Sequence, residues 1–197
     1  IFSTDGTVRV GGGSSVNNNH ANRAGGGVEV IDGTFRLQNS SLNFNDAGNG
    51  AANPGNGGGL HVSGTSGTDT RIKNSQVIGN EAASEGGGLW NQAGSVMQVV
   101  RSNVQDNTAS GDDADNGGGG IFNNGGTLIV SESTIHSNDA DGASGSGGGI
   151  FSTDGSVRVI DGSSITENQA NRAGGGVEVI DGGFRILDSA RKNNVAG

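Results

Sequence analysis

The chain has 197 residues, of which 41 are glycine, 30% are hydrophobic and none is cysteine or tyrosine. The lack of cysteine excludes disulfides and thiolate metal sites, and glycine without a three-residue period excludes a collagen triple helix. With 20 acidic and 11 basic residues, the net charge of −9 argues against nucleic acid and anionic membranes as partners. No apolar run reaches the ~18 residues of a membrane-spanning helix, so no membrane insertion is predicted in this span.

One pattern recurs along the whole chain. It opens with a run of glycines and then an aliphatic residue, and its seven copies start at Ile1, Val28, Leu60, Leu89, Ile121, Ile150 and Val177. Glycine costs about 1 kcal/mol per helical position relative to alanine, so helix is disfavoured. Apolar residues alternate with polar ones instead, which predicts short strands with one buried face. In chain order the clearest lie at 8–10, 35–37, 128–130, 157–159 and 184–186.

Each copy of the pattern closes on a serine, an asparagine five residues later and an alanine two residues after that. The asparagines are Asn19, Asn45, Asn80, Asn107, Asn138, Asn168 and Asn194. A corner asparagine inside a stack of coils can donate and accept amide hydrogen bonds above and below, so these residues predict an internal ladder. The residue between serine and asparagine is aliphatic except in the last copy, where it is Arg191.

Successive ladder asparagines are 26 to 35 residues apart, the extremes being Asn19 to Asn45 and Asn45 to Asn80. This period predicts an all-β fold, a right-handed parallel β-helix (solenoid) of about seven coils that forms a single domain over residues 1–197. A leucine-rich repeat has a similar period, but leucine is scarce here and the connections contain no helix formers. Length varies mainly between each alanine and the next glycine run, so one corner is predicted to carry the loops.

A longer repeat is also present. Residues 1–48 align without gaps on residues 150–197 and share the sequences IFSTDG, VRV and ANRAGGGVEVIDG. We therefore expect the chain to be a fragment of a longer tandem-repeat protein. Neither end shows a polar cap, which predicts end-to-end self-association.

Two of these motifs carry a resemblance to known proteins. The GGGI of residues 147–150 and the GGGGI of residues 117–121 combine with the aliphatic-x-x-Asn of residues 135–138 and 165–168. The combination resembles the GGAI and FxxN repeats of chlamydial-type polymorphic outer-membrane proteins. It is also similar to glycine-rich repeats of bacterial surface and secreted proteins of the pectin-lyase-like superfamily. Here glycine replaces the alanine, and Val, Leu or Ile mostly replaces the phenylalanine.

The resemblance implies a secreted, extracellular or cell-surface protein of the adhesin-stalk type. Its partners would be glycans or proteins of the host or cell surface, and no particular ligand carries over. We therefore expect a non-catalytic structural or adhesin-type stalk. The alternative is a carbohydrate-binding or polysaccharide-degrading β-helix, because the same superfold hosts polysaccharide lyases and hydrolases.

An enzyme of that kind needs clustered carboxylates on one exposed sheet. The residues after the first aliphatic of each coil are expected to point outward as one row: Phe2, Glu29, His61, Trp90, Phe122, Phe151 and Glu178. This row holds no pair of carboxylates on adjacent coils. His20, His61 and His136 occupy three different repeat positions, so they are not expected to converge.

Three further features are candidates for binding. Trp90, Phe122 and Phe151 predict an external aromatic stack, either a surface for sugar rings or partners or a structural row. Asp112, Asp113 and Asp115 form the densest acidic loop, which could bind Ca²⁺ or be merely solvated; no other cofactor is expected. The third feature is a row of arginines on the outward face of the second strand of the coils: Arg9, Arg36, Arg71, Arg158 and Arg185. This arginine row could bind an anionic glycan, or it could pair with nearby acids such as Glu29, Asp32, Glu178 and Asp181.

Overall fold

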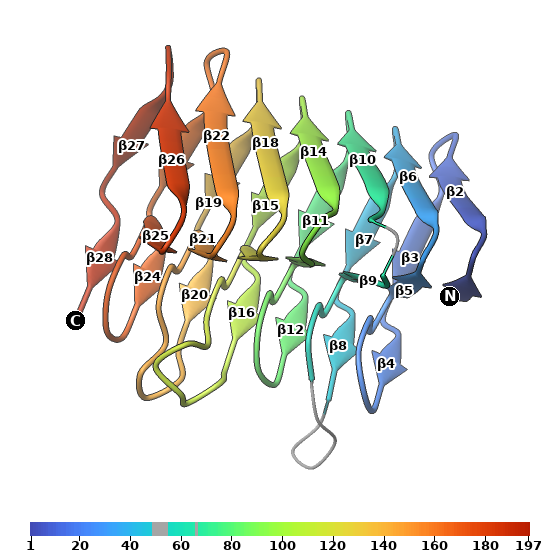
Figure 1. Ribbon diagram of the computed structural model, residues 1–197, viewed down its shortest axis with the longest axis horizontal. Coiled ribbons are helices and arrows are strands. Elements are labelled where there is room, and N and C mark those ends of the chain that lie inside the picture. The colour runs from blue at the N-terminus through green and yellow to red at the C-terminus, as the bar shows by residue number, and fades with distance from the viewer. Residues whose placement is uncertain (49–54, 66) are drawn as a thin grey trace.

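The computed structural model describes residues 1–48, 55–65 and 67–197. In these residues the chain is all-β, with 28 short strands in four parallel sheets of seven strands each. The coils stack along one axis, so the N-terminus and C-terminus lie at opposite ends of the molecule (Figure 1). The predicted right-handed parallel β-helix of about seven coils is therefore confirmed.

Each coil contributes one strand to every sheet. The first sheet contains β1 (Phe2–Thr4), β5 (Val28–Ile31), β9 (Leu60–Ser63), β13 (Leu89–Asn91), β17 (Ile121–Asn124), β21 (Ile150–Thr153) and β25 (Val177–Ile180). The second sheet contains β2 (Thr7–Gly11), β6 (Thr34–Gln38), β10 (Asp69–Lys73), β14 (Val96–Val100), β18 (Thr127–Ser131), β22 (Ser156–Ile160) and β26 (Gly183–Ile186).

The third sheet contains β3 (Ser15–Asn17), β7 (Ser41–Asn43), β11 (Gln76–Ile78), β15 (Asn103–Gln105), β19 (Thr134–His136), β23 (Ser164–Thr166) and β27 (Ala190–Lys192). The fourth contains β4 (His20–Ala21), β8 (Asp46–Ala47), β12 (Glu81–Ala82), β16 (Thr108–Ala109), β20 (Asp139–Ala140), β24 (Gln169–Ala170) and β28 (Val195–Ala196). We number the coils 1 to 7, so that coil 1 comprises β1–β4 and coil 7 comprises β25–β28.

The core consists of aliphatic rows that run along the axis. On the second sheet, for example, Ile72, Val99 and Val130 lie in register on neighbouring strands, and all three are fully buried. Their strands alternate between buried and partly exposed residues, as the sequence pattern predicted. No coil could bury its aliphatic residues alone, because their partners are the equivalent residues of the coils on either side.

The predicted asparagine ladder is formed. Asn107 is fully buried, and its backbone N–H and its side-chain Nδ2 both donate to Asn138 Oδ1, at 3.1 and 2.9 Å. Nδ2 also donates to the Val77 carbonyl at 3.0 Å, while Oδ1 accepts from the backbone and side chain of Asn80. The same bonds recur from Asn19 to Asn194. The ladder therefore satisfies polar backbone groups that water cannot reach.

The repeated serine has a second structural role beyond its small size. From Ser40 to Ser163, each of these serines donates its backbone N–H to the serine Oγ of the next coil, as from Ser75 to Ser102 at 3.1 Å and from Ser102 to Ser133 at 3.0 Å. The Oγ of Ser75 in turn donates to the carbonyl of Lys73, two residues earlier, at 2.7 Å. A serine ladder thus runs parallel to the asparagine ladder.

The glycine runs form the corner between the fourth sheet and the first. At Gly118 the backbone has φ of 65°, a left-handed conformation that glycine adopts without strain. At Gly119 a Cβ atom would overlap the backbone of Asp139 in the fourth sheet of the same stack. The corner therefore requires glycine both for its backbone conformation and for close packing of main chain on main chain.

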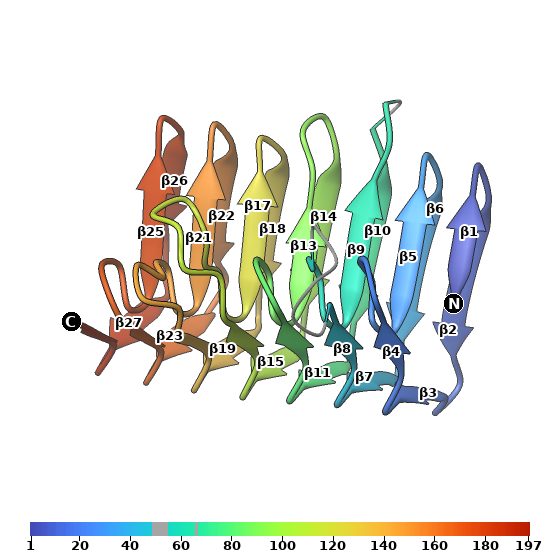
Figure 2. The same ribbon diagram turned by 90° about the horizontal axis from the view of Figure 1, so that it is seen from below.

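The connections at this corner are the most variable in length, as predicted. They include residues 83–88, 110–120 and 141–149. In Figure 1 and Figure 2 the 110–120 connection extends beyond its own coil toward the C-terminal coils. Arg172 Nη2 donates to the Ala114 carbonyl at 2.8 Å and so joins this connection to the one two coils further on.

Candidate functional site: a covered row on the first sheet

The predicted outer row exists on the first sheet. Glu29, His61, Trp90, Phe122 and Phe151 occupy equivalent positions on β5, β9, β13, β17 and β21. The rings of His61 and Trp90 stack with centroids 4.5 Å apart, and those of Trp90 and Phe122 are 6.3 Å apart and nearly parallel. Phe122 and Phe151 meet edge to face at 5.2 Å. The aromatic stack that the sequence predicts is therefore present.

The prediction that this stack is external is wrong. Only 7% of Trp90, 3% of Phe122 and none of Phe151 is exposed, and the three form a hydrophobic cluster separate from the main core. The glycine-rich connections cover the row: an added Cβ on Gly86 would lie 3.2 Å from the Trp90 Cβ. The row therefore offers little aromatic surface to a sugar ring, and its burial favours the structural interpretation.

A carboxylate and an imidazole meet at one end of the row. Glu29 and His61 are 7% and 5% exposed, and His61 Nδ1 lies 3.6 Å from Glu29 Oε1. Arg23, in the connection before β5, also pairs with Glu29. Burial alone would raise the pKa of Glu29, but His61 and the charge of Arg23 outweigh it and lower this pKa below its ordinary value. This contact was not predicted from the sequence, where paired carboxylates and convergent histidines were the expected signs of a site.

Glu85 lies beside Trp90, in the connection that precedes β13. Its Oε2 accepts hydrogen bonds from Trp90 Nε1 and from Asn56 Nδ2, each at 3.0 Å. The pKa of Glu85 is raised above its ordinary value, chiefly by burial and further by the charge of Asp115, although the two hydrogen bonds oppose the shift. Glu85 thus fastens two connections to the covered row.

The raised pKa of Glu85 has a consequence for stability. The carboxyl of Glu85 binds its proton more tightly in the folded chain than in the unfolded chain. Its contribution to the free energy of unfolding is therefore complete below the pKa that Glu85 has in the unfolded chain. It is lost as the pH rises through the folded pKa. We expect Glu85→Gln to reduce the loss of stability between acidic and neutral pH, because an amide oxygen can accept the same bonds without charge.

Denaturation curves at a series of pH values test this expectation. Trp90 is the single tryptophan of the chain, so its fluorescence reports directly on this site. Identical pH profiles for the native chain and Glu85→Gln would contradict the expectation.

The acidic loop is open to solvent. Asp112, Asp113 and Asp115 are all exposed, and Asp112 Oδ1 accepts a hydrogen bond from the backbone N–H of Ala143 at 2.8 Å. This bond links the 110–120 connection to the next one. In residues 1–48, 55–65 and 67–197 no group of three or more His, Cys, Asp or Glu side chains is placed to hold a metal ion. Calcium binding here stays a prediction.

The arginine row lies on the outer face of the second sheet. Arg9, Arg36 and Arg71 are in direct register on β2, β6 and β10, and Lys73 lies two residues beyond Arg71. Arg36 pairs with Asp69 at 3.1 Å, whereas Arg71 Nε is buried without a hydrogen-bond partner in the part of the chain that is described. Arg36, Arg71 and Lys73 line a shallow depression of about 140 Å³.

Two of the acids that were expected to pair with the arginine row pair with other arginines instead. Glu29 pairs with Arg23, and Glu178 pairs with Arg172 at 3.3 Å. Both arginines belong to the corner connections and not to the second sheet. The predicted pairing of the row with Glu29 and Glu178 is therefore wrong, and the row keeps much of its positive charge.

Comparison of the sequence with protein-family models gives no match, and comparison with curated proteins gives none either. The class of the protein comes from its strand pairing, which defines an all-β parallel solenoid of seven coils. The described residues contain no helix capable of spanning a membrane.

Proposed function

We propose that this chain is a non-catalytic, rigid rod in an extracellular or cell-surface protein of the adhesin-stalk type. The observation that supports the proposal most is the unbroken pairing of strands in all four sheets from coil 1 to coil 7. Such a stack resists bending because each coil is hydrogen-bonded to its neighbours along every side. The corner loops can vary without disturbing this stack, so they suit contacts with glycans or proteins of another surface.

The motifs in residues 117–121 and 147–150 add support for an extracellular setting. They resemble repeats of chlamydial-type polymorphic outer-membrane proteins and of pectin-lyase-like surface proteins. The burial of Trp90 and the half-buried position of Glu85 also fit a structural role, because Glu85 accepts hydrogen bonds from Trp90 and from Asn56.

Incubation with a panel of neutral and acidic polysaccharides, with and without calcium, tests the non-catalytic part of the proposal. We expect no release of reducing ends or unsaturated sugars. Product release from any polysaccharide would contradict the proposal, and its loss in Glu29→Gln or His61→Ala would place the chemistry at the covered row.

A second candidate function is the binding of an acidic polysaccharide by the second sheet. The outer face of this sheet carries one acid, Asp69, and six cations: Arg9, Arg36, Arg71, Lys73, Arg158 and Arg185. Three arginines stacked in register repel one another, and an anionic chain laid across the strands would relieve this repulsion.

Binding to sulfated and uronic-acid polysaccharides tests this candidate. Each charge-assisted hydrogen bond is worth about 1.5–3 kcal/mol, so Arg36→Ala with Arg71→Ala is expected to weaken binding at least roughly tenfold. Arg101→Ala is the control, because Arg101 pairs with Glu132 at another corner. Equal weakening by the control, or equal binding of double-stranded DNA, would contradict a specific carbohydrate site.

A further inference from the structure

A groove runs along one side of the stack, at the corner between the second and third sheets. It consists of two adjoining depressions of about 290 and 500 Å³, which share Asn74, Ser75 and Gln76. We call it the side groove, and its lining comes from residues 13–14, 39–41, 74–76, 101–103, 132 and 134. These residues belong to successive coils, so the side groove is parallel to the axis and crosses the strands.

One side of the groove is lined by a row of turn residues that share a left-handed backbone. The φ angle is 50° at Asn39, 48° at Asn74, 46° at Arg101 and 49° at Glu132. Asn74 Nδ2 donates to Asn39 Oδ1, and Arg101 Nε donates to Asn74 Oδ1, each at 3.1 Å. Arg101 also pairs with Glu132 at 3.7 Å. These contacts hold the polar side chains of coils 2 to 5 in a connected row.

The other side is lined by the first outward residue of each third-sheet strand. The strand registers place these residues in a second row along the axis: Ser41, Gln76, Asn103 and Thr134. All four side chains are uncharged hydroxyls or amides. Gln76 is exposed, and its side chain makes no hydrogen bond within the described part of the chain. Its amide therefore keeps two donors and an acceptor for a ligand.

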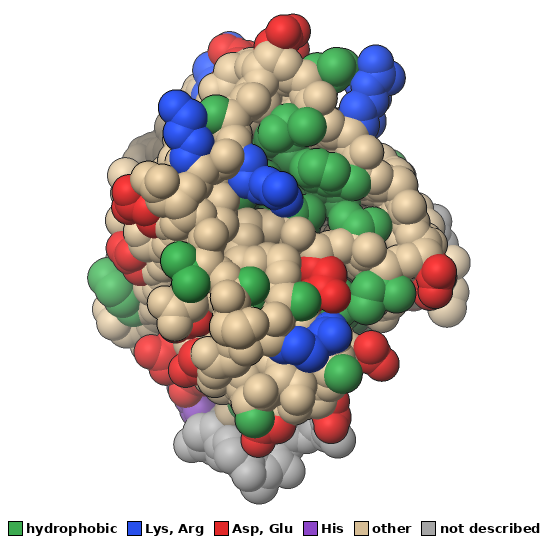
Figure 3. Space-filling view, turned by 90° about the vertical axis from the view of Figure 1, so that its left-hand side faces the viewer, with side chains coloured by type: hydrophobic (Ala, Val, Ile, Leu, Met, Phe, Trp, Pro, Cys, Tyr) green, Lys and Arg blue, Asp and Glu red, His purple; other side chains and the backbone are tan. Residues whose placement is uncertain are grey.

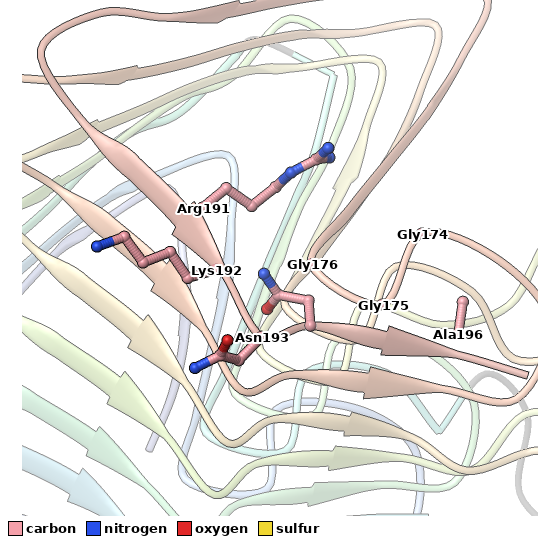
Figure 4. A pocket seen from close by; sticks show the side chains of 8 residues that line it. Gly174, Gly175, Gly176, Arg191, Lys192, Asn193 and Ala196 are labelled. Carbon is pink, nitrogen blue, oxygen red and sulfur yellow. The ribbon is translucent and has the colours of Figure 1, made fainter.

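The hollow at coil 7 is a different surface. It has a volume of about 380 Å³ and opens on the end face of the stack, where hydrophobic side chains gather in the centre with Lys and Arg side chains beside and over them (Figure 3). Arg191 extends across this hollow, while Lys192 leaves β27 on the other side (Figure 4). Residues 174–196 line it, whereas the side groove is built from successive coils that each have a neighbour.

The chemistry of the side groove favours one class of ligand. Among the described residues no hydrophobic side chain lines it, so a peptide would find no pocket for its apolar side chains. Its two charged residues, Arg101 and Glu132, pair with each other and leave no net charge to attract an ionic polymer. A neutral polysaccharide presents hydroxyls that both donate and accept, as the lining amides and hydroxyls do. Its repeating units would meet equivalent side chains on successive coils.

We infer that the side groove binds a neutral polysaccharide laid along the axis of coils 2 to 5, with Gln76 and Asn103 at its centre. The site is separate from the arginine row of the second sheet and takes an uncharged ligand. The inference goes beyond the proposed rod function and beyond the binding of an acidic polysaccharide. It holds or fails independently of both, because neither requires the side groove.

Affinity electrophoresis in native gels that contain a β-glucan, a mannan or a galactan tests the inference. We expect at least one of these neutral polymers to retard the native chain, and added salt to leave the retardation unchanged, because the site has no net charge. Gln76→Ala with Asn103→Ala removes two amides from the groove. This double variant is expected to bind roughly fivefold more weakly or worse.

Two further double variants are the controls. Gln169→Ala with Asn124→Ala removes the same two kinds of amide from exposed positions on other sheets and is expected to bind as the native chain does. Arg36→Ala with Arg71→Ala is also expected to keep neutral binding, which separates the side groove from the second sheet. Circular dichroism confirms that each variant is folded.

Oligosaccharides of the retarding polymer test its direction on the surface. Coils 2 to 5 span about 14 Å, which is three intervals of roughly 4.8 Å. In isothermal titration calorimetry the affinity is expected to rise with oligosaccharide length up to this span and then to level off. An affinity that does not depend on length would contradict a polymer laid along the axis.

Three other results would overturn the inference. In the first, none of the neutral polysaccharides retards the native chain. In the second, the control without Gln169 and Asn124 is weakened as much as the variant without Gln76 and Asn103. In the third, peptides selected from a random library bind the native chain and lose binding in the groove variant while no polysaccharide does, so that the occupant is a peptide.

Discussion

Asn107→Ala is expected to lower the free energy of unfolding by about 3–5 kcal/mol, because a buried polar group left without a partner costs about 1–3 kcal/mol. The substitution removes the acceptor of Asn80, the donor to the Val77 carbonyl and a donor to Asn138 Oδ1. All of these bonds lie inside the solenoid, where water cannot replace them.

Urea denaturation followed by circular dichroism measures this loss. Asn124→Ala is the matched control, because Asn124 lies exposed at the end of β17 and belongs to no ladder. We expect the control to change stability by less than about 0.5 kcal/mol. A loss at Asn107 no larger than that of the control would show that the ladder is not a main source of stability.

Gly119→Ala is expected to cost about 3 kcal/mol or more. The added Cβ would overlap three main-chain atoms of Asp139, so no flexible side chain can move aside to make room. Because the corner joins the fourth sheet to the first, relief of the overlap would disturb strand pairing in both. In urea denaturation followed by circular dichroism, we expect Gly119→Ala to have a lower midpoint and to refold more slowly than the native chain.

Gly183→Ala is the control for the loss of glycine itself. No atom lies within 4 Å of a Cβ at Gly183, and its backbone is not in the left-handed region. Its effect is expected to stay within about 1 kcal/mol and could be slightly stabilising, since alanine restricts the unfolded chain. If Gly119→Ala is no worse than Gly183→Ala, the close approach of the two backbone segments is not required.

The repeat made much of this fold predictable. Three spaced residues, as in Ser133, Asn138 and Ala140, mark the same corner in every coil, and stacked corners leave few options besides a parallel solenoid. The ladder followed from the chemistry of an amide that must both donate and accept. The serine ladder was not predicted, because the small size of serine already explained why it occurs at a tight bend.

Other features depend on how the connections fold, which the repeat does not encode. Trp90 was expected outside because alternation places it opposite the core, but the glycine-rich connection then covers it. Left-handed backbone at Phe44, Ser137 and Glu167, with φ of 54–57°, was also not predictable, because these residue types rarely adopt it. Glu29 and His61 were correctly placed on adjacent coils of one row, but their contact was not predicted, because paired carboxylates and convergent histidines were the expected signs of a site.

Deletion of one whole coil tests the account most directly. Removing residues 108–138 joins Asn107 to Asp139, which occupies the same position as Thr108 in the fourth sheet. If the chain is a rod of interchangeable coils, the shortened protein should fold cooperatively, and small-angle X-ray scattering should show a length reduced by about 4.8 Å with an unchanged cross-section. An unfolded chain, or a changed cross-section at the same length, would contradict the account.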